Sequence, residues 1–282
     1  MPQNDLCTVP QVLAFLPQGT ETDAVTLGAL ITAASGAILS DIQRAPVYAQ
    51  TYTDVFDGYG GYETRKMLRK WPVLSVTSLV IYNNTLVPST IQPATGGFGG
   101  GWVLEPWDGQ LPGRPQLLDL RGMRYWAGTQ NITATYVAGY QVSGEQQLIP
   151  ATSPYVLSPL APMGPWCRDG GVLYVGGTAL VPVAASPSAG QYVPPVFGAA
   201  TTQYTFSPAD AGRAVATTYS FVPSPLNQAA IEVASEAYRY RQRVGLKSQA
   251  MPGPLSTSYD LSRATAAVRW MTQPYRQVVP LP

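Results

Sequence analysis

The chain has 282 residues, of which 45% are hydrophobic and only 12% charged, and its formal net charge is +1. This length fits two domains or one domain with a large insertion, and the near-neutral charge excludes a global field drawing the protein to nucleic acid or membrane. Histidine is absent and the two cysteines are isolated, which excludes the usual Cys/His zinc sites and histidine-based nucleophile pairs. We expect no metal and no cofactor.

Glycine and proline contribute 27 residues each, which favours many turns and short strands. Residues 1–5 are polar and lack the basic start and apolar run of a signal peptide. No apolar stretch approaches the roughly 18 to 20 residues of a membrane span. We expect a soluble protein that is made in a cytoplasm, with both thiols free.

Two helices are predicted near the N-terminus. Residues 8–15 form a short one with Thr8 as its cap, and a longer one follows a cap region at residues 20–23 and runs to about Arg44. The apolar positions of the longer helix share one face: Leu27, Leu30, Ile31, Ala34, Ile38 and Ile42. We expect this face to pack against a helix near the C-terminus.

From Val47 the hydrophobic period changes to two. Residues 48–56 and 62–69 flank Asp-Gly-Tyr-Gly-Gly, a pattern that predicts a hairpin. Residues 73–82 are the strongest strand, with a turn at Asn83 and Asn84, and two more strands are expected at 116–119 and 131–137. The glycine-rich residues 93–101 are a loop, because no Lys-Ser/Thr follows to bind phosphate.

Residues 143–223 differ from the rest in their low charge and their short, proline-punctuated strands. The expected strands cover 171–175, 179–183, 203–206 and 214–222, and the last alternates large and small side chains. We predict a small β-sandwich inserted into the rest of the chain. A long disordered loop is the alternative.

Residues 225–245 are the strongest helix signal. Pro225 suits the first turn, Ser224 the cap, and Gly245 a left-handed C-terminal cap. The expected buried stripe is Leu226, Ala230, Val233, Ala237, Tyr240 and Val244, and the opposite face carries Glu232, Glu236, Arg239, Arg241 and Arg243. Residues 225–282 hold seven Lys/Arg against three Asp/Glu, which hints at an acidic partner surface.

A final helix is expected at 261–273, ended by Pro274, and residues 275–282 form an apolar, extended tail. The predicted fold class is therefore α+β: a helical bundle core from the N- and C-terminal helices, a hairpin and sheet region, and the inserted sandwich. The predicted domains are an adaptor-type core of 1–142 with 224–282 and a module of 143–223.

The order of these segments resembles the head–tail connector (adaptor) proteins of tailed bacteriophages. The stretches that carry the resemblance are WPVLSVTSLVIY at 71–82, AYRYRQRVGL at 237–246 and PYR at 274–276. It covers roughly 1–142 and 224–282. The insertion of about 80 residues departs from the simpler members of the family, so the family says nothing of its role.

The resemblance implies a structural, non-enzymatic virion protein at the head–tail junction, with no catalytic residue. It implies a ring, usually of twelve copies, between the portal protein and the next neck or tail protein, with DNA passing through without sequence-specific binding. By analogy, the contact candidates for portal or neighbouring subunit are Arg239, Arg241, Arg243, Tyr275, Arg276, Val278, Val279 and Leu281.

Two other classes of function stay open from the sequence. One is a β-rich tail or decoration protein that binds a receptor or polysaccharide through the inserted module, with Trp166 and Tyr192 as stacking platforms. The other is an enzyme, such as a glycosidase with Glu105 and Asp108 as its carboxylate pair.

Overall fold

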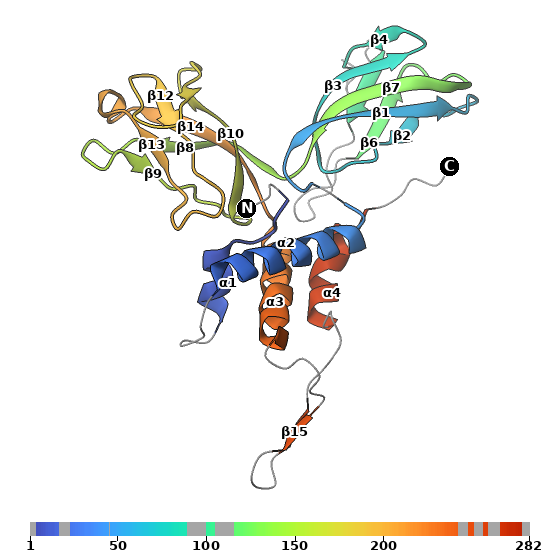
Figure 1. The fold of residues 1–282 in the computed structure, drawn as a ribbon. Helices are drawn as coiled ribbons and strands as arrows, with labels where there is room; N and C mark the ends of the chain where they lie inside the picture. The colour runs from blue at the N-terminus through green and yellow to red at the C-terminus, as the bar shows by residue number, and fades with distance from the viewer. Residues whose placement is uncertain are drawn as a thin grey trace. The chain divides into compact units, whose positions relative to one another are not determined.

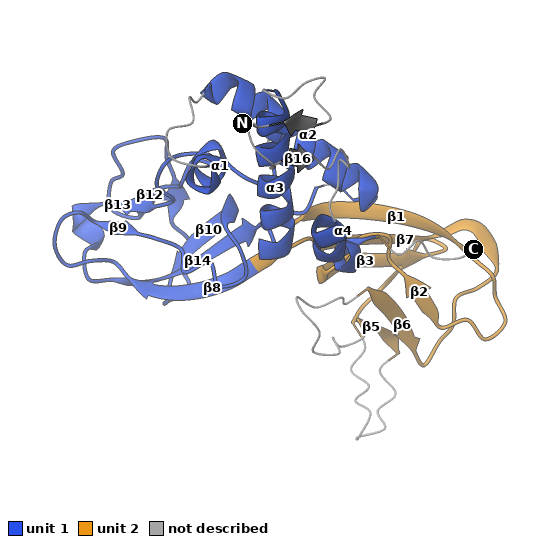
Figure 2. Ribbon diagram, turned by 90° about the horizontal axis from the view of Figure 1, so that it is seen from below, with its two compact units in different colours: residues 1–47, 142–276 blue, residues 48–141, 277–282 orange. Residues whose placement is uncertain are grey.

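The computed structural model describes residues 4–16, 23–44, 46–88, 100–104, 116–241, 248–250, 256–258 and 266–277. Figure 1 shows its helices and strands. Its contacts define two compact units, coloured separately in Figure 2: unit 1 holds residues 1–47 and 142–276, and unit 2 holds 48–141 and 277–282. The division expected from the sequence stays a prediction, and the contacts group the chain along different lines.

The predicted helical bundle core is wrong. Strands make up 38% of the protein and helices 25%. Two hydrophobic cores are built from strand side chains, one in each unit. The many glycines and prolines interrupt the chain too often for long helices, and the helices form one cluster within unit 1.

The N-terminal helices begin where their caps predict. Helix α1 is Val9–Phe15, and Thr8 and Gln11 form a capping box at its start. Helix α2 is Ala24–Asp41, and the Asp23 carboxylate accepts hydrogen bonds from the backbone of Val25 and Thr26. The expected apolar face is buried except for Leu30, and Ser35 and Leu39 join it.

Helix α3 is Ser224–Tyr240 and contacts α1, α2 and α4. The predicted packing of the two long helices is therefore confirmed. Helix α4 is Ala266–Thr272 and continues into the 3-10 turn η3, Gln273–Tyr275. The expected starts of this last helix at 261–265 and the cap at Gly245 lie outside the described residues.

The buried face of α3 differs from the predicted stripe. Leu226 and Ala230 are buried as expected, whereas Tyr240 is 44% exposed. The other buried residues of the helix are Asn227, Ala229, Ile231, Ala234, Ser235 and Tyr238. Two polar residues, Asn227 and Ser235, thus lie among the buried residues, and Asn227 contacts the N-terminal segment.

That segment is held by a chain of hydrogen bonds. The Asn227 amide donates to the Leu6 carbonyl (2.8 Å) and to the Gln11 side chain (3.2 Å). The backbone N–H of Leu6 donates to the Ser35 hydroxyl of α2 (2.9 Å). Residues next to α1 therefore connect α2 and α3, which are about 200 positions apart in the sequence.

Among the described residues, α2 alone is long and apolar enough to cross a membrane by length and composition, with 18 residues and a mean hydropathy of 1.5. The expectation that no stretch approaches this length is wrong. Core helices of soluble proteins pass the same test, and α2 packs on α1 and α3. The absence of a membrane partner stays a prediction.

The residues predicted to form the inserted module belong to unit 1 and contain two sheets. One sheet has the order β10-β14-β8, built from Trp166–Tyr174, Ala214–Phe221 and Gln141–Leu148. The other has the order β11-β12-β13-β9, and its strands are Val181–Pro182, Gln191–Val193, Tyr204–Phe206 and Val156–Leu157. The short 3-10 helix η1, Pro208–Asp210, precedes β14. The sequence missed β8, β9 and β12.

The module passes directly into α3. Ser224 begins the helix and its backbone and hydroxyl both donate to the Met163 carbonyl (3.0 Å each), so it does not act as the expected cap. A Cβ atom at Gly164 would lie 1.9 Å from the Val222 carbonyl oxygen. Only glycine fits where the turn crosses the strand end.

Unit 2 contains two sheets. The order of the larger is β1-β7-β3-β4, with strands Gln50–Gly58, Gly128–Ala138, Val73–Ile81 and Asn84–Leu86. The smaller has the order β2-β6-β5, with strands Arg65–Met67, Leu117–Arg121 and Gly101–Leu104. Short strands β15, Ser248–Ala250, and β16, Ser256–Ser258, pair with each other in unit 1.

The expected hairpin of 48–56 with 62–69 is wrong. Strand β1 pairs along its length with β7, and β2 pairs with β6 in the other sheet. The buried Asp54 fixes this arrangement, because its carboxylate accepts from the Tyr136 hydroxyl of β7 (2.7 Å) and from the Arg69 backbone (2.9 Å). The strand at 73–82 is confirmed as β3.

Asn227→Ala should lower the free energy of unfolding of the helix cluster by about 1–3 kcal/mol, because the buried Leu6 carbonyl loses its donor. Gln228→Ala is the matched control, since that amide donates to its helix neighbour Glu232 (3.1 Å), and we expect a change within about 0.5 kcal/mol. Urea unfolding followed by helical circular dichroism measures both. Equal effects would contradict the role given to Asn227.

Candidate functional site

The contact residues expected from the resemblance fall into two places on the helix cluster. Arg239 is exposed in the last turn of α3, and Arg241 is exposed just after it. Arg276 is exposed after η3, whereas Tyr275 is only 7% exposed and belongs to the core. Arg243, Val278, Val279 and Leu281 lie outside the described residues.

Arg241 already has a place within the chain. Its guanidinium donates to the Tyr238 hydroxyl (3.3 Å) and lies 4.6 Å from the centre of that ring. The same hydroxyl accepts from the Asp23 backbone at the start of α2 (3.3 Å). Hydrogen bonds from Thr26, and the Arg241 charge to a smaller extent, lower the pKa of the Asp23 carboxyl. Arg241 therefore supports the α2–α3 contact.

A groove of about 560 Å³ runs between α2, α3 and α4. Its apolar lining comes from all three helices: Ala37, Ile38, Ile42, Val233 and Val268. Arg269 and Arg276 add positive charge and Asp41 a negative one. Of the predicted contact residues described by the structure, Arg276 alone lines this groove, and Arg239 lies elsewhere on α3.

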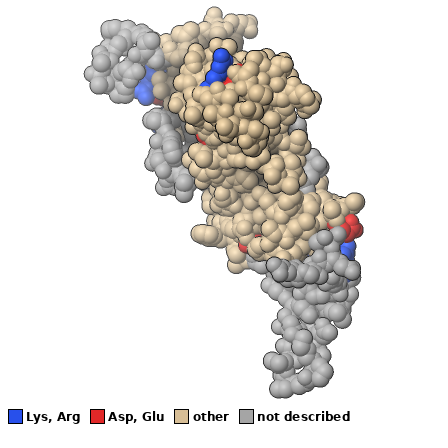
Figure 3. Space-filling model, turned by 90° about the vertical axis from the view of Figure 1, so that its left-hand side faces the viewer, with Lys and Arg blue, Asp and Glu red and all other residues tan. Residues whose placement is uncertain are grey.

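The inserted module uses its acidic residues internally. It has three, and each accepts a hydrogen bond from a tyrosine hydroxyl: Glu145 from Tyr219 (2.6 Å), Asp169 from Tyr192 (2.6 Å) and Tyr204 (3.1 Å), and Asp210 from Tyr174 (2.7 Å). Hydrogen-bonded carboxylates of this kind stabilise a core with few charges. Figure 3 shows how sparse charged side chains are on one face of the molecule.

The two aromatic side chains expected as stacking platforms are not available for that role. Tyr192 is 1% exposed and Trp166 is 7% exposed. The Trp166 indole donates to the Tyr204 hydroxyl (3.1 Å), which in turn donates to Asp169. Both side chains belong to the module core, so this prediction is wrong.

The described residues offer no site for glycosidase, metal or thiol chemistry. Glu105 and Asp108, the carboxylate pair of the glycosidase alternative, lie outside the described residues. Within the described part of the chain, no group of three or more His, Cys, Asp or Glu could hold a metal ion. Both cysteines are free, and burial raises the pKa of each thiol to about 12, which keeps them protonated.

Unit 2 carries a group of exposed large hydrophobic side chains, four of them aromatic, that the sequence analysis missed. We call it the aromatic end: Tyr59, Tyr62, Tyr82, Met123 and Trp126, each between 38% and 94% exposed. They come from the loop after β1, the β3–β4 turn and the loop before β7. The sequence signal was the density of tyrosine and tryptophan at the ends of the predicted strands and in the segments between them.

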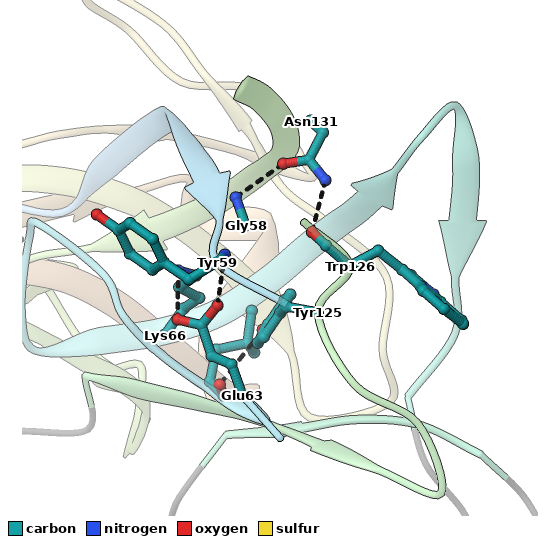
Figure 4. Close-up of polar contacts among 8 residues, drawn as sticks. Gly58, Tyr59, Glu63, Lys66, Tyr125, Trp126 and Asn131 are labelled. Atoms are coloured by element: carbon teal, nitrogen blue, oxygen red, sulfur yellow. Dashed lines mark hydrogen bonds and ion pairs between the residues drawn. The ribbon is translucent and has the colours of Figure 1, made fainter. Parts of the chain in front are cut away.

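Hydrogen bonds between side chains and backbone groups hold the loops of the aromatic end (Figure 4). The Asn131 side chain accepts from the Gly58 N–H (2.8 Å) and donates to the Trp126 carbonyl (2.9 Å). The Glu63 carboxylate accepts from the Tyr59 N–H (3.1 Å) and pairs with Lys66 (2.5 Å). The Trp126 indole points away from this network.

The Tyr82 side chain is fixed from two directions. Its backbone lies in the left-handed region, with a φ of 47°, and its N–H donates to the Asn131 carbonyl (3.0 Å). Its hydroxyl donates to the Ala127 carbonyl. A bulky residue with this backbone conformation costs roughly 1–2 kcal/mol. The surrounding hydrogen bonds therefore hold Tyr82 in a conformation that its own backbone disfavours.

Tyr82 and Trp126 line an open pocket of about 550 Å³. The other lining residues are Ile81, Asn84, Leu86, Met123, Arg124 and Ala127. The Arg124 guanidinium lies 5.3 Å from the centre of the Trp126 ring and donates to the Gly61 carbonyl (3.1 Å). The pocket is mostly apolar, and besides the two aromatic residues its polar side chains are the Asn84 amide and the Arg124 guanidinium.

No protein-family model matches the chain, and no curated protein sequence matches it.

The module should lose stability as the pH rises above about 10, the ordinary pKa of tyrosine. Burial, and for Tyr192 and Tyr204 the neighbouring Asp169, raise the pKa of the buried tyrosines well above that value. Above pH 10 the unfolded chain therefore binds fewer protons than the folded one, and stability falls by about 1.4 kcal/mol per pH unit for each such tyrosine.

Thermal unfolding between pH 8 and 11.5 measures this slope. Tyr204→Phe should reduce the fall in the free energy of unfolding by about 1.4 kcal/mol per pH unit, which is the contribution of one tyrosine. An unchanged slope would show that the Tyr204 hydroxyl is not held in its neutral form by the fold.

Gly58→Ala should destabilise unit 2, because a Cβ atom there would lie 1.9 Å from the Trp126 carbonyl oxygen. We expect a loss of about 1–3 kcal/mol in the free energy of unfolding. Gly176→Ala is the control, since nothing lies within 4 Å of its added Cβ. Urea unfolding measures both variants. If the Gly58 and Gly176 variants unfold at the same urea concentration, the backbones at Gly58 and Trp126 do not approach as closely as described.

Proposed function

We propose that the chain is a head–tail adaptor of a tailed bacteriophage, a structural virion protein that forms a ring between portal and tail. The observation that carries the proposal is the helix cluster. Helices α2, α3 and α4 come from opposite ends of the chain and pack together, and the resemblance to adaptor proteins rests partly on these segments.

A ring subunit needs a rigid body and two different faces, so that head-to-tail contacts close into a cycle. The cluster supplies the rigid body, since the N-terminal segment ties α2 to α3. It also offers unlike surfaces: the groove with Arg269 and Arg276, and the exposed face of α3 with Glu236 and Arg239. Neighbouring copies and the portal are the partners that we assign to them.

Helix α4 carries a further exposed side chain, Trp270, which is 76% exposed and does not line the groove. Tryptophan and arginine are the residue types that most often dominate the binding energy of protein interfaces. A partner with apolar and acidic side chains would complement this part of the cluster.

DNA is a passenger in this proposal. Each phosphate that a channel wall neutralises adds affinity and slows passage. A net charge of +1 over 282 residues keeps such contacts few. The next neck or tail protein would bind the far side of the ring, and assembly would take place in the host cytoplasm.

Sedimentation of the purified chain, alone and with the portal protein of the same phage, tests the proposal. We expect a monomer or weak oligomer alone and a ring of about twelve copies on the portal, as the resemblance implies. Failure to sediment with the portal at any salt concentration would contradict the adaptor role.

Arg276→Glu should weaken portal association at least tenfold, because it reverses a charge on the groove. Arg276→Lys keeps the charge and should stay within about threefold. Co-sedimentation at about 0.15 M salt measures the affinity. Interactions between charges more than about 8 Å apart are largely screened at this salt concentration, so a change in affinity reports on direct contacts of Arg276. Equal binding by both variants would remove Arg276 from the interface.

A further inference from the structure

We propose that the aromatic end of unit 2 binds a neutral carbohydrate, with a pyranose ring stacked on Tyr82 and Trp126. This site is separate from the surfaces assigned to the adaptor role. The proposal rests on how the two rings are held, on the polar groups beside them and on the charges around them.

The rings are exposed and fixed at the same time. Tyr82 is 50% exposed and Trp126 is 56% exposed, yet their backbones are both bonded to Asn131. The Tyr82 hydroxyl is already used on the Ala127 carbonyl. What these residues offer a ligand is therefore the flat face of each ring, in a fixed position, at little cost in side-chain entropy.

A flat aromatic face suits a ligand with an apolar face and a polar edge. A pyranose presents C–H groups on its faces, and these carry partial positive charge that the negative face of an aromatic ring attracts. Its hydroxyl groups lie at the edge and both donate and accept hydrogen bonds. A pocket of about 550 Å³ has room for such a ring.

The two polar side chains of the pocket match those hydroxyl groups. The Asn84 amide can both donate and accept, and Arg124 has further N–H donors beyond the one bonded to Gly61. The guanidinium lies over the Trp126 ring, 5.3 Å from its centre, so it occupies one face of the indole and the sugar would stack on the other. The Asn84 amide is the polar side chain that we assign to the edge of the sugar.

The charges near the pocket argue against the other ligands that stack on aromatic rings. Single-stranded nucleic acid needs a positively charged groove along its backbone, but Arg65 and Arg121 pair with Asp119, and Lys66 pairs with Glu63. An organic cation would meet Arg124 and no carboxylate among the lining residues that the structure describes. A neutral ligand fits best.

A glycan array of neutral oligosaccharides, probed with the intact chain, tests the proposal. Hits are then titrated by tryptophan fluorescence, beside an oligo-dT decamer and a proline decapeptide as the competing ligand classes. We expect saturable binding of at least one oligosaccharide, and a loss of at least tenfold in affinity for Trp126→Ala. Tyr82→Asn should lose a similar factor, because asparagine tolerates the left-handed turn but has no ring.

Trp270→Ala is the matched control, since it removes an exposed indole from unit 1, and its affinity should equal that of the unaltered chain. Thermal unfolding confirms that each variant is folded. No glycan binding by the intact chain, or equal binding by the Trp126 and Trp270 variants, would overturn the proposal. Tighter binding of the oligonucleotide or the proline peptide would also overturn it. So would a Trp126-dependent fluorescence change that appears only when the protein self-associates at high concentration.

Discussion

The contact between α2 and α3 is the interaction on which unit 1 depends. The two helices lie at opposite ends of the sequence, and every residue of the inserted module lies between them. Their packing is reinforced at both ends of α3: Asn227 binds the N-terminal segment near one end, and the Tyr238 hydroxyl meets the start of α2 near the other. Because the last strand of the module ends at Phe221 and α3 begins at Ser224, the start of α3 also fixes where the C-terminal end of the module lies.

A protein with so few charges uses its polar groups sparingly. In the module, each carboxylate holds at least one tyrosine hydroxyl, and in unit 2 the buried Asp54 does the same for Tyr136. This pairing satisfies buried polar atoms and places large aromatic rings in the core. It also explains why aromatic residues in the module are poor candidates for ligand binding, whereas those of the aromatic end stay exposed.

The sequence predicted elements with strong local signals. Caps and helical periodicity located α1, α2 and most of α3, and the β-branched run at 73–82 located β3. The prediction from sequence failed where residues far apart in the chain determine the strand pairing. Strand β1 pairs with β7, where the buried Asp54 accepts a hydrogen bond from Tyr136, although the glycine-rich loop after β1 resembles a hairpin turn. The stripe on α3 was misjudged because Asn227 and Ser235 are polar and yet buried. Tyr82 was predicted only as the end of a strand and Trp126 was assigned to no element, since no local pattern reveals that three loops meet.

Native-state hydrogen exchange tests most directly whether α2 and α3 form one cooperative body. If they do, the central amides of Leu27–Leu39 and Ala229–Tyr238 exchange with the same free energy of opening, and Asn227→Ala lowers both by the same amount. Exchange of α2 through an opening that leaves α3 protected would contradict the account, because the two helices would then be stable independently of their contact.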